Sequence, residues 1–306
     1  MNRSQFNKAV VPGLFSLMVD AYRPRAGQEE WRQVVSAVKP SNRAYEESAY
    51  FAGLGNLSRK AEGEPIQYDE MVQGPTRRWT HTTYALGVRI TEELIEDSLY
   101  PEIGEMEMIS RELGTSGKET LNVLVFDMYN SITATTTHTG GDGLALASGS
   151  HTALRGGTWS NLLSPAADLS ASSLQVMIQN FETTRDDTGK YQVIRPKEVL
   201  VNPASEWKLK ELLQSTYDPE SANNAVNVLR SRNLQPRVTP YYTDTDGATL
   251  IADPPSSNGG FIVFMRRKVT FARDGDFQTG DALFKTTFRF SVECNKPNNV
   301  YHSAGA

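Results

Sequence analysis

The chain has 306 residues, of which 39% are hydrophobic, and it carries a formal net charge of −5 at pH 7. This length suffices for one large domain or two modest ones. The acidic balance argues against a dedicated nucleic-acid binder, which would carry a basic domain or patch. Cys294 is the one cysteine, so no internal disulfide can form. No apolar run approaches the roughly 18 residues of a membrane span, and we expect a protein that is soluble in the cytoplasm when it is made.

Residues 2–39 carry apolar side chains at roughly helical spacing, but Pro12 and Gly13 interrupt the pattern. We expect a short helix or an extended arm there, with a second short segment beginning at Glu29. The stretch is too broken for a membrane span, and no small-residue cleavage site of a signal peptide follows it cleanly.

The stretch from Tyr45 to Arg89 is punctuated by glycine and proline and holds few large apolar residues. Between Thr83 and Ile90, apolar and polar residues alternate, which predicts a half-buried strand. The whole stretch predicts a long β-hairpin. An isolated two-stranded hairpin is marginal in water, so one that cannot bury a face in its own domain should dock on a neighbour or be disordered.

A long helix is predicted next. Thr91 is followed by two acidic residues, which together make a good helix start. From Pro101 to Ile132, apolar residues recur three or four apart, a run equivalent to about 45 Å of helix. Gly104, Gly114 and Gly117 weaken the prediction of an unbroken helix. Gly117 lies on the apolar face, where a small residue indicates that another element packs closely.

The rest of the chain alternates between helical and strand patterns. Residues 133–157 are polar and predict a long loop, whereas helices are predicted to begin at Asp168 and at Glu206. Strands are predicted at 198–201, 238–243, 248–252, 261–265 and, most clearly, 284–294. Asp244 to Gly247 predicts the turn of a hairpin between two of these strands. The order of elements indicates an α+β fold.

Two sequence patterns resemble ligand-binding loops but lack their essential residues. Gly117-Lys118 has neither the earlier glycine nor the following hydroxyl of a phosphate-binding loop. Asp244-Thr-Asp246 resembles the start of a calcium loop, but Thr249 and Pro255 stand where that loop requires glycine and an acid. We interpret the first as part of a closely packed helix and the second as a turn.

The histidines and the cysteine have simple structural interpretations. His138, Asp142 and His151 could in principle hold a metal, but their spacing matches no usual ligand motif, which favours a polar loop. His81 is expected on the surface and His302 in a frayed terminus. Cys294, on the apolar face of the last strand, is expected to be a small core residue. We therefore predict no catalytic residue, metal site or cofactor, although a catalytic pair assembled from distant residues stays open.

Three segments of the second half resemble those of a known family. They are Ser160–Ser170 (S-N-L-L-S-P-A-A-D-L-S), Arg195–Pro203 (R-P-K-E-V-L-V-N-P) and Leu283–Ser291 (L-F-K-T-T-F-R-F-S). With the order of arm, extended hairpin, long helix and mixed domain, they resemble the major capsid (head) proteins of tailed bacteriophages, the Mu-like kind among them. These proteins share their fold with herpesvirus capsid subunits. In the second segment the apolar positions after Lys197 are offset by one.

The resemblance implies five structural units. These are an N-terminal arm (1–44), an extended loop formed by the hairpin (45–90), a peripheral domain with a spine helix (91–164), an axial domain (165–265) and C-terminal strands that return to the peripheral domain (266–306). It also implies that the protein self-assembles into hexamers and pentamers, which form an icosahedral head around double-stranded DNA. The extended loop would lie over a neighbouring copy, with contacts from Leu54, Leu57, Arg59, Lys60, Glu62, Ile66, Tyr68, Arg77, Arg78 and Trp79.

The implied partners are first of all other copies of the chain. Because the sequence starts directly at the arm, a separate scaffolding protein is expected, together with a portal protein and, as a further candidate, a decoration protein. The resemblance implies that the DNA is enclosed without sequence-specific binding and that no membrane is involved. The protein would be in the host cytoplasm during assembly and in the virion afterwards. Two alternatives stay open: another phage structural subunit, and an unrecognised hydrolase with the hairpin as a lid. The long helix argues against a tail-tube protein.

Overall fold

The computed structural model describes residues 16, 19–22, 29–91, 93, 103–219, 225–254 and 259–306. Most of the helix or arm predicted before Glu29 lies outside these residues, as do Glu92 and residues 94–102 in the helical stretch predicted from Thr91. The described helices include none that combines the length and the apolar character required to cross a bilayer.

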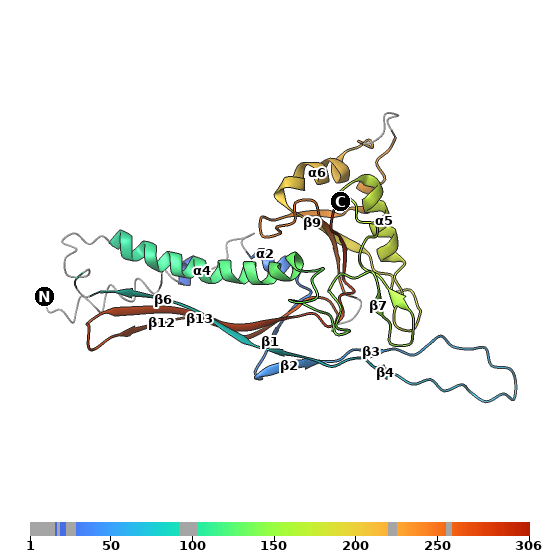
Figure 1. Cartoon of the computed structure of the whole chain (residues 1–306), viewed down its shortest axis with the longest axis horizontal. Helices are drawn as coiled ribbons and strands as arrows, with labels where there is room; N and C mark the ends of the chain where they lie inside the picture. Colours follow the sequence, from blue (N-terminus) through green and yellow to red (C-terminus); the bar gives the residue numbers. More distant parts are fainter. Residues whose placement is uncertain are drawn as a thin grey trace.

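A long, narrow sheet forms one half of the molecule (Figure 1). Its strands lie in the order β1 (Ala37–Pro40), β12 (Ile262–Gly275), β13 (Ala282–Glu293) and β6 (Thr82–Ile90). β1 runs parallel to β12, and the other pairs are antiparallel. The predicted last strand is confirmed as β13, where Phe284, Phe288 and Phe290 are buried on one face.

The helix α4 (Ile103–Asn130) lies along this first sheet. Its 28 residues confirm the predicted long helix, and the glycines do not break it. A Cβ atom placed on Gly117 would lie 3.3 Å from Cγ2 of Thr286 and 3.6 Å from Cγ1 of Val269. Gly117 therefore allows the helix to approach the sheet closely, as its place on the apolar face predicts.

The main core lies where the second half of α4 meets the sheet. Phe126, Tyr129 and Phe261 are buried there, and the rings of Tyr129 and Phe261 meet edge to face at 4.7 Å. The short helix α2 (Glu30–Val34) adds Trp31 and Val34 to the same cluster. The hydroxyl of Tyr129 donates a hydrogen bond of 2.5 Å to the carbonyl of Val34, which ties the two helices together.

A second sheet forms the other half of the body. Its strands lie in the order β10 (Gln235–Val238), β9 (Pro196–Val201), β11 (Ala248–Ala252) and β14 (Val300–Ser303). The helices α5 (Ala171–Glu182) and α6 (Glu206–Gln214) pack on it through a second core cluster. Ser170 caps α5, because its hydroxyl accepts from the backbone N–H of Ser173 and the Ser173 hydroxyl accepts from that of Ser170.

The prediction of a hairpin around Asp244 to Gly247 is wrong. The carboxylate of Asp244 does accept from the backbone N–H of Gly247 at 2.9 Å, so the segment is a turn. The flanking strands β10 and β11, however, are not neighbours, because each pairs with β9 on opposite sides. The strand β9 inserts between them from about 40 residues earlier, a distance that local turn signals cannot reveal.

The end of the chain returns to this second sheet, and the expected fraying of His302 is wrong. β14 pairs with β11, so residues 266–306 are divided between the two sheets. His302 is buried, with its Nδ1 atom 2.9 Å from the Thr249 hydroxyl. Burial lowers the pKa of His302 from 6.5 to about 4.

The remaining elements are the 3-10 turns η1 (Pro203–Ser205) and η2 (Leu229–Arg232) and the small strand pair β7 (His151–Thr152) and β8 (Thr158–Trp159).

His302 should make the subunit less stable in acid. Between pH 6.5 and 4 the unfolded chain binds a proton at this ring and the folded chain does not, so stability falls as pH falls, by up to about 3 kcal/mol over the interval. A His302→Gln variant should lose less stability between the same two pH values, measured by urea unfolding at each. Parallel pH profiles for the two proteins would contradict this assignment.

Candidate inter-subunit hairpin

Residues 45–80 form a hairpin that projects from the body (Figure 1), here called the projecting hairpin. At its root β2 (Tyr45–Ser48) pairs with β5 (Arg77–Thr80), and further out β3 (Phe51–Ala52) pairs with β4 (Val72–Gln73). Residues 53–71 belong to no strand pair. The predicted hairpin is thus confirmed up to residue 80. The expected inclusion of residues 82–90 is wrong, because β6 pairs with β13 in the first sheet.

The root of the projecting hairpin is fixed by arginine contacts. The Arg77 guanidinium donates to the carbonyl and the hydroxyl of Thr139 and to the carbonyl of Gly140, each at 2.5 Å. Arg78 pairs with Glu47 at 2.7 Å and lies 4.0 Å over the ring of Tyr45. The contacts of Arg78 join β5 to β2, and those of Arg77 join β5 to the loop after α4. The root is therefore attached to the body.

A second group of contacts lies halfway along the projecting hairpin. Arg155 pairs with the Asp69 carboxylate at 2.8 Å, and the same carboxylate accepts from the backbone N–H of Gly55 at 2.7 Å. The bond from Gly55 and the pairing with Arg155 lower the pKa of Asp69. On the opposite arm of the projecting hairpin, the Lys190 ammonium donates to the carbonyl of Leu54 at 2.6 Å. The body therefore holds both arms up to residues 54–55 and 69–70.

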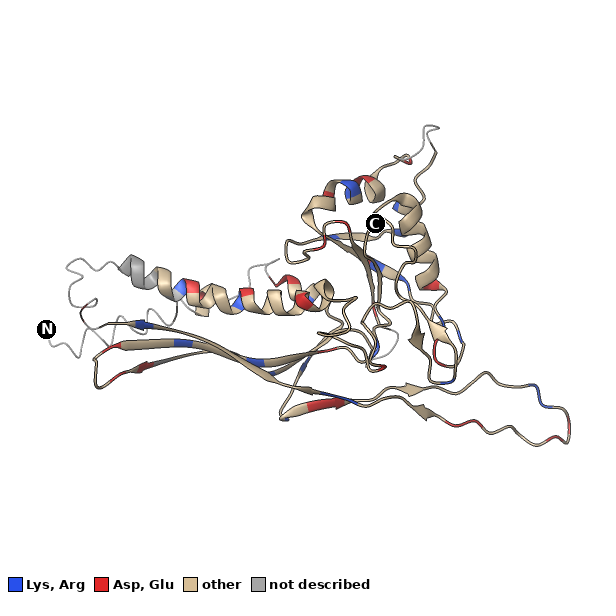
Figure 2. Cartoon of the chain, in the orientation of Figure 1, with Lys and Arg blue, Asp and Glu red and all other residues tan. Residues whose placement is uncertain are grey.

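Beyond these contacts the tip of the projecting hairpin, residues 56–68, exposes apolar side chains. Leu57 and Tyr68 are almost completely exposed, and Ile66 is about two-thirds exposed. In a subunit alone in water, such exposed residues add no stability, because they bury no apolar surface. Their position at the end of a projection is typical of a surface that another molecule covers. Arg59, Lys60 and Glu62 are exposed at the same tip, and Figure 2 shows its basic and acidic residues side by side along the trace.

The ten residues predicted as inter-subunit contacts fall into two groups. Seven are exposed near or at the tip: Leu54, Leu57, Arg59, Lys60, Glu62, Ile66 and Tyr68. Arg77, Arg78 and Trp79 lie at the root, where they make contacts within their own chain, such as the 5.8 Å approach of Arg77 to the Trp79 ring. Three further exposed apolar residues, Phe51, Met71 and Val72, were not singled out by the sequence. Their signal was their large apolar side chains, in a stretch that holds few of them.

The expected surface position of His81 is wrong. His81 connects β5 to β6 and is buried, with Nε2 at 3.0 Å from the Ser41 hydroxyl and Nδ1 at 2.9 Å from the Ser291 hydroxyl. Burial lowers the pKa of His81, against the opposing effect of Glu46, whose carboxylate accepts from Ser41 at 2.5 Å. Satisfied buried hydrogen bonds fix one geometry. The junction between hairpin and sheet is therefore rigid.

The other histidines singled out by the sequence each lie beside one acidic residue. His151 is buried against Asp142 at 2.6 Å and stacks on the Trp159 ring at 4.4 Å, whereas His138 lies apart beside Asp127 at 3.1 Å. Cys294 is buried in the main core, as predicted, and burial raises its pKa. Over the described ranges, histidine, cysteine and acidic residues nowhere gather in a group that could hold a metal ion.

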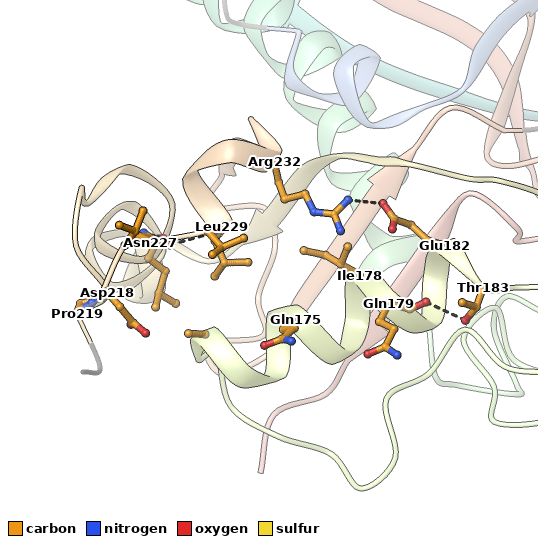
Figure 3. A pocket seen from close by; sticks show the side chains of 14 residues that line it. Gln175, Ile178, Gln179, Glu182, Thr183, Asp218, Pro219, Asn227, Leu229 and Arg232 are labelled. Atoms are coloured by element: carbon orange, nitrogen blue, oxygen red, sulfur yellow. Dashed lines mark hydrogen bonds and ion pairs between the residues drawn. The ribbon is translucent and has the colours of Figure 1, made fainter. Parts of the chain in front are cut away.

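A shallow groove of about 440 Å³ lies on the second-sheet half, between α5 and residues 226–232 (Figure 3). Ile178 and Leu229 face it from opposite sides, and Arg232 pairs with Glu182 across one end at 2.8 Å. The described residues that line it include no serine, cysteine, lysine or histidine. The groove therefore gives no support to an enzyme.

Solved structures with this arrangement of elements include capsid proteins and the protein of a virus-like particle. The capsid of a native GTA particle matches with a TM-score of 0.57 at 11% identity, covering 92% of this chain and 91% of that one. The Mycobacterium phage Adephagia protein matches with a TM-score of 0.56 at 10% identity, covering 90% of each chain. A virus-like particle from Pyrococcus furiosus matches with a TM-score of 0.51 at 12% identity, covering 95% of this chain and 98% of that one. The chain therefore has the α+β fold of tailed-phage capsid proteins.

The sequence itself gives the family. Residues 75–303 match the family model described as phage capsid protein, so the chain belongs to that family. No curated protein matches the sequence. As a member, the protein is a capsid shell subunit of a virion and a structural protein rather than an enzyme, which sets the hydrolase alternative aside. The Mu-like subtype stays a prediction.

The contacts halfway along the projecting hairpin can be tested on the subunit alone. An Arg155→Ala variant should be cleaved faster by protease between residues 53 and 71, because one arm of the projecting hairpin loses its attachment to the body. Its global stability should change by less than about 1 kcal/mol, since the ion pair is partly exposed to solvent. The matched control is Arg232→Ala, which breaks a pair of the same 2.8 Å length on the second-sheet half. Equal cleavage in the two variants would contradict the attachment.

Proposed function

We propose that the chain is a major capsid protein that assembles into hexamers and pentamers, and that these form an icosahedral head around double-stranded DNA. The observation that carries the proposal is the tip of the projecting hairpin, which holds Leu57 and Tyr68 almost fully exposed to solvent. Membership of the capsid family supports a shell, and the exposed tip supports a contact in which each copy covers part of the next.

The physical argument concerns how a shell closes. Burying one Leu or Tyr side chain at a contact contributes roughly 1.5–3 kcal/mol, from which the entropy of ordering the tip must be subtracted. A single tip contact is therefore weak and reversible. A subunit in a shell meets several neighbours at once, so weak contacts add to a stable whole. A weak and reversible contact between subunits fits a hairpin with a rigid root and an exposed tip. The root holds the tip at a fixed place, and the tip itself makes only a weak contact with the neighbour.

The two halves of the body suggest how copies are arranged. We assign the first sheet with α4 to the peripheral domain, and the second sheet with α5 and α6 to the axial domain around the five-fold and six-fold axes. The net charge of −5 supports DNA that is held by a closed shell rather than by a basic lining. A separate scaffolding protein and a portal protein are the expected partners, with a decoration protein as a further candidate.

The double variant Leu57→Ser/Tyr68→Ser tests the contact. Both side chains are exposed, so the subunit should fold with unchanged stability. The concentration required for assembly should rise about tenfold or more, because the contact loses the burial of two apolar side chains. Light scattering and electron microscopy of the assembled fraction would measure this change.

The matched control is Leu57→Met/Tyr68→Phe, which keeps apolar side chains at both positions and should assemble like the original chain. Normal assembly of the serine variant would exclude the tip as an inter-subunit contact. If the original chain forms no rings or shells, with and without a scaffolding partner, the proposal of assembly into a capsid is wrong.

A further inference from the structure

The first sheet ends differently at its two edges. The β1 edge has four residues and closes with Pro40, which has no N–H to offer to another strand. The β6 edge has nine residues, contains no proline, and pairs with β13 over its full length without a register shift. Soluble proteins usually protect sheet edges with short strands, prolines, bulges or lysines. The edge strand β1 is protected in this way, and the edge strand β6 is not.

The β6 edge strand has several exposed residues. Within the described residues, no strand pairs with β6 on the side away from β13. Leu86, at the centre of β6, is 50% exposed, although Tyr84 and Val88 on the same face are half-buried. Ala85 and Gly87, on the opposite face, are exposed as well. A nine-residue row of backbone groups with an apolar centre is therefore available to a second chain.

The place of Leu86 follows from the packing of α4. Leu86 pairs in register with Thr286 of β13, and Thr286 is the residue that Gly117 approaches. The helix thus covers β13 at this level, whereas Leu86 on the next strand stays half exposed. Tyr84 is held by stacking on Phe288 at 5.4 Å, so it is already engaged. Among the large apolar residues of β6, Leu86 is the exposed one.

We propose that two copies of the chain join by antiparallel pairing of β6 with β6, across a two-fold axis at Leu86. This pairing rests on the proposed function, because it assumes that the chain assembles into a shell. It is a second contact between copies, separate from the contact made by the tip of the projecting hairpin. The pairing would extend the four-stranded sheet into a continuous eight-stranded sheet shared by two subunits.

A second copy fits this edge because the strand is complementary to itself. Around a two-fold axis at Leu86, Thr82 faces Ile90 and Tyr84 faces Val88, so apolar residues meet apolar residues at the centre. Arg89 faces Thr83, so no like charges meet, and its own partner is Asp281 of β13. A contact of this kind uses one patch twice, which is the commonest arrangement in homo-oligomers. A strand of a different protein would require no such symmetry.

A cross-link at the axis tests the pairing directly. Cross-strand partners have Cβ atoms about 4.5–5.5 Å apart, close enough for a disulfide after a small adjustment. In assembled particles of a Leu86→Cys variant, mild oxidation should give covalent dimers on a non-reducing gel. The natural Cys294 is buried and does not interfere. The matched control is Thr82→Cys, whose two copies would lie eight residues apart, or about 27 Å, and should stay monomeric.

A charge at the same position provides the second measurement. Leu86→Lys would bring two ammonium groups together at the axis, and assembly should require about tenfold more protein. Its control is Val123→Lys on α4, where the original side chain is 51% exposed, close to the 50% of Leu86. This control should assemble like the original chain.

The outcomes separate this proposal from the others. Dimers from Leu86→Cys but not from Thr82→Cys support it, and equal or absent cross-linking in well-formed particles overturns it. If Leu86→Lys blocks assembly while Leu86→Cys gives no dimer, a different segment occupies the edge and the symmetric pairing is wrong. Absence of particles from the original chain would count against the proposed function instead. The cross-link would then be measured on the concentrated subunit, where the same comparison decides.

Discussion

The close packing of α4 on the first sheet determines the shape of the subunit. Gly117 allows the helix to lie against β12 and β13, and its 28 residues, about 42 Å of helix, stiffen a sheet of only four strands. A narrow sheet of this length would otherwise expose one apolar face. The main core forms where the second half of α4 meets the sheet, and the second sheet and the projecting hairpin extend from this region.

Rigidity and exposure are separated along the projecting hairpin. Its root is held by Arg77 and by the buried hydrogen bonds of His81, and its middle is held by the pair of Arg155 and Asp69. The tip contributes almost nothing to the subunit's own core. This division presents an apolar surface at a defined position without the entropy cost of ordering the entire projection at each contact. The weak contact that a shell subunit requires then follows from the geometry.

Local sequence patterns predicted most of the helices and strands. The pairing of the strands and the burial of individual side chains depend on residues distant in sequence. The spacing of apolar residues predicted α4, the alternation around Phe288 predicted β13, and the glycines and prolines after Tyr45 predicted the hairpin. His81 and His302 were placed at the surface because their partners, Ser291 and Thr249, lie 210 and 53 positions away. A sequence pattern does not indicate which strand inserts between β10 and β11, or that β6 leaves the hairpin for β13.

Hydrogen exchange at the tip of the projecting hairpin tests the central claim most directly. In the free subunit, the backbone amides of residues 56–68 belong to no strand pair and should exchange with solvent at rates close to those of an unfolded peptide. In purified shells the same amides should be protected, because a neighbouring copy covers them. Equally fast exchange in shells and in free subunits would show that the tip remains in solvent, and would contradict its role as a contact between copies.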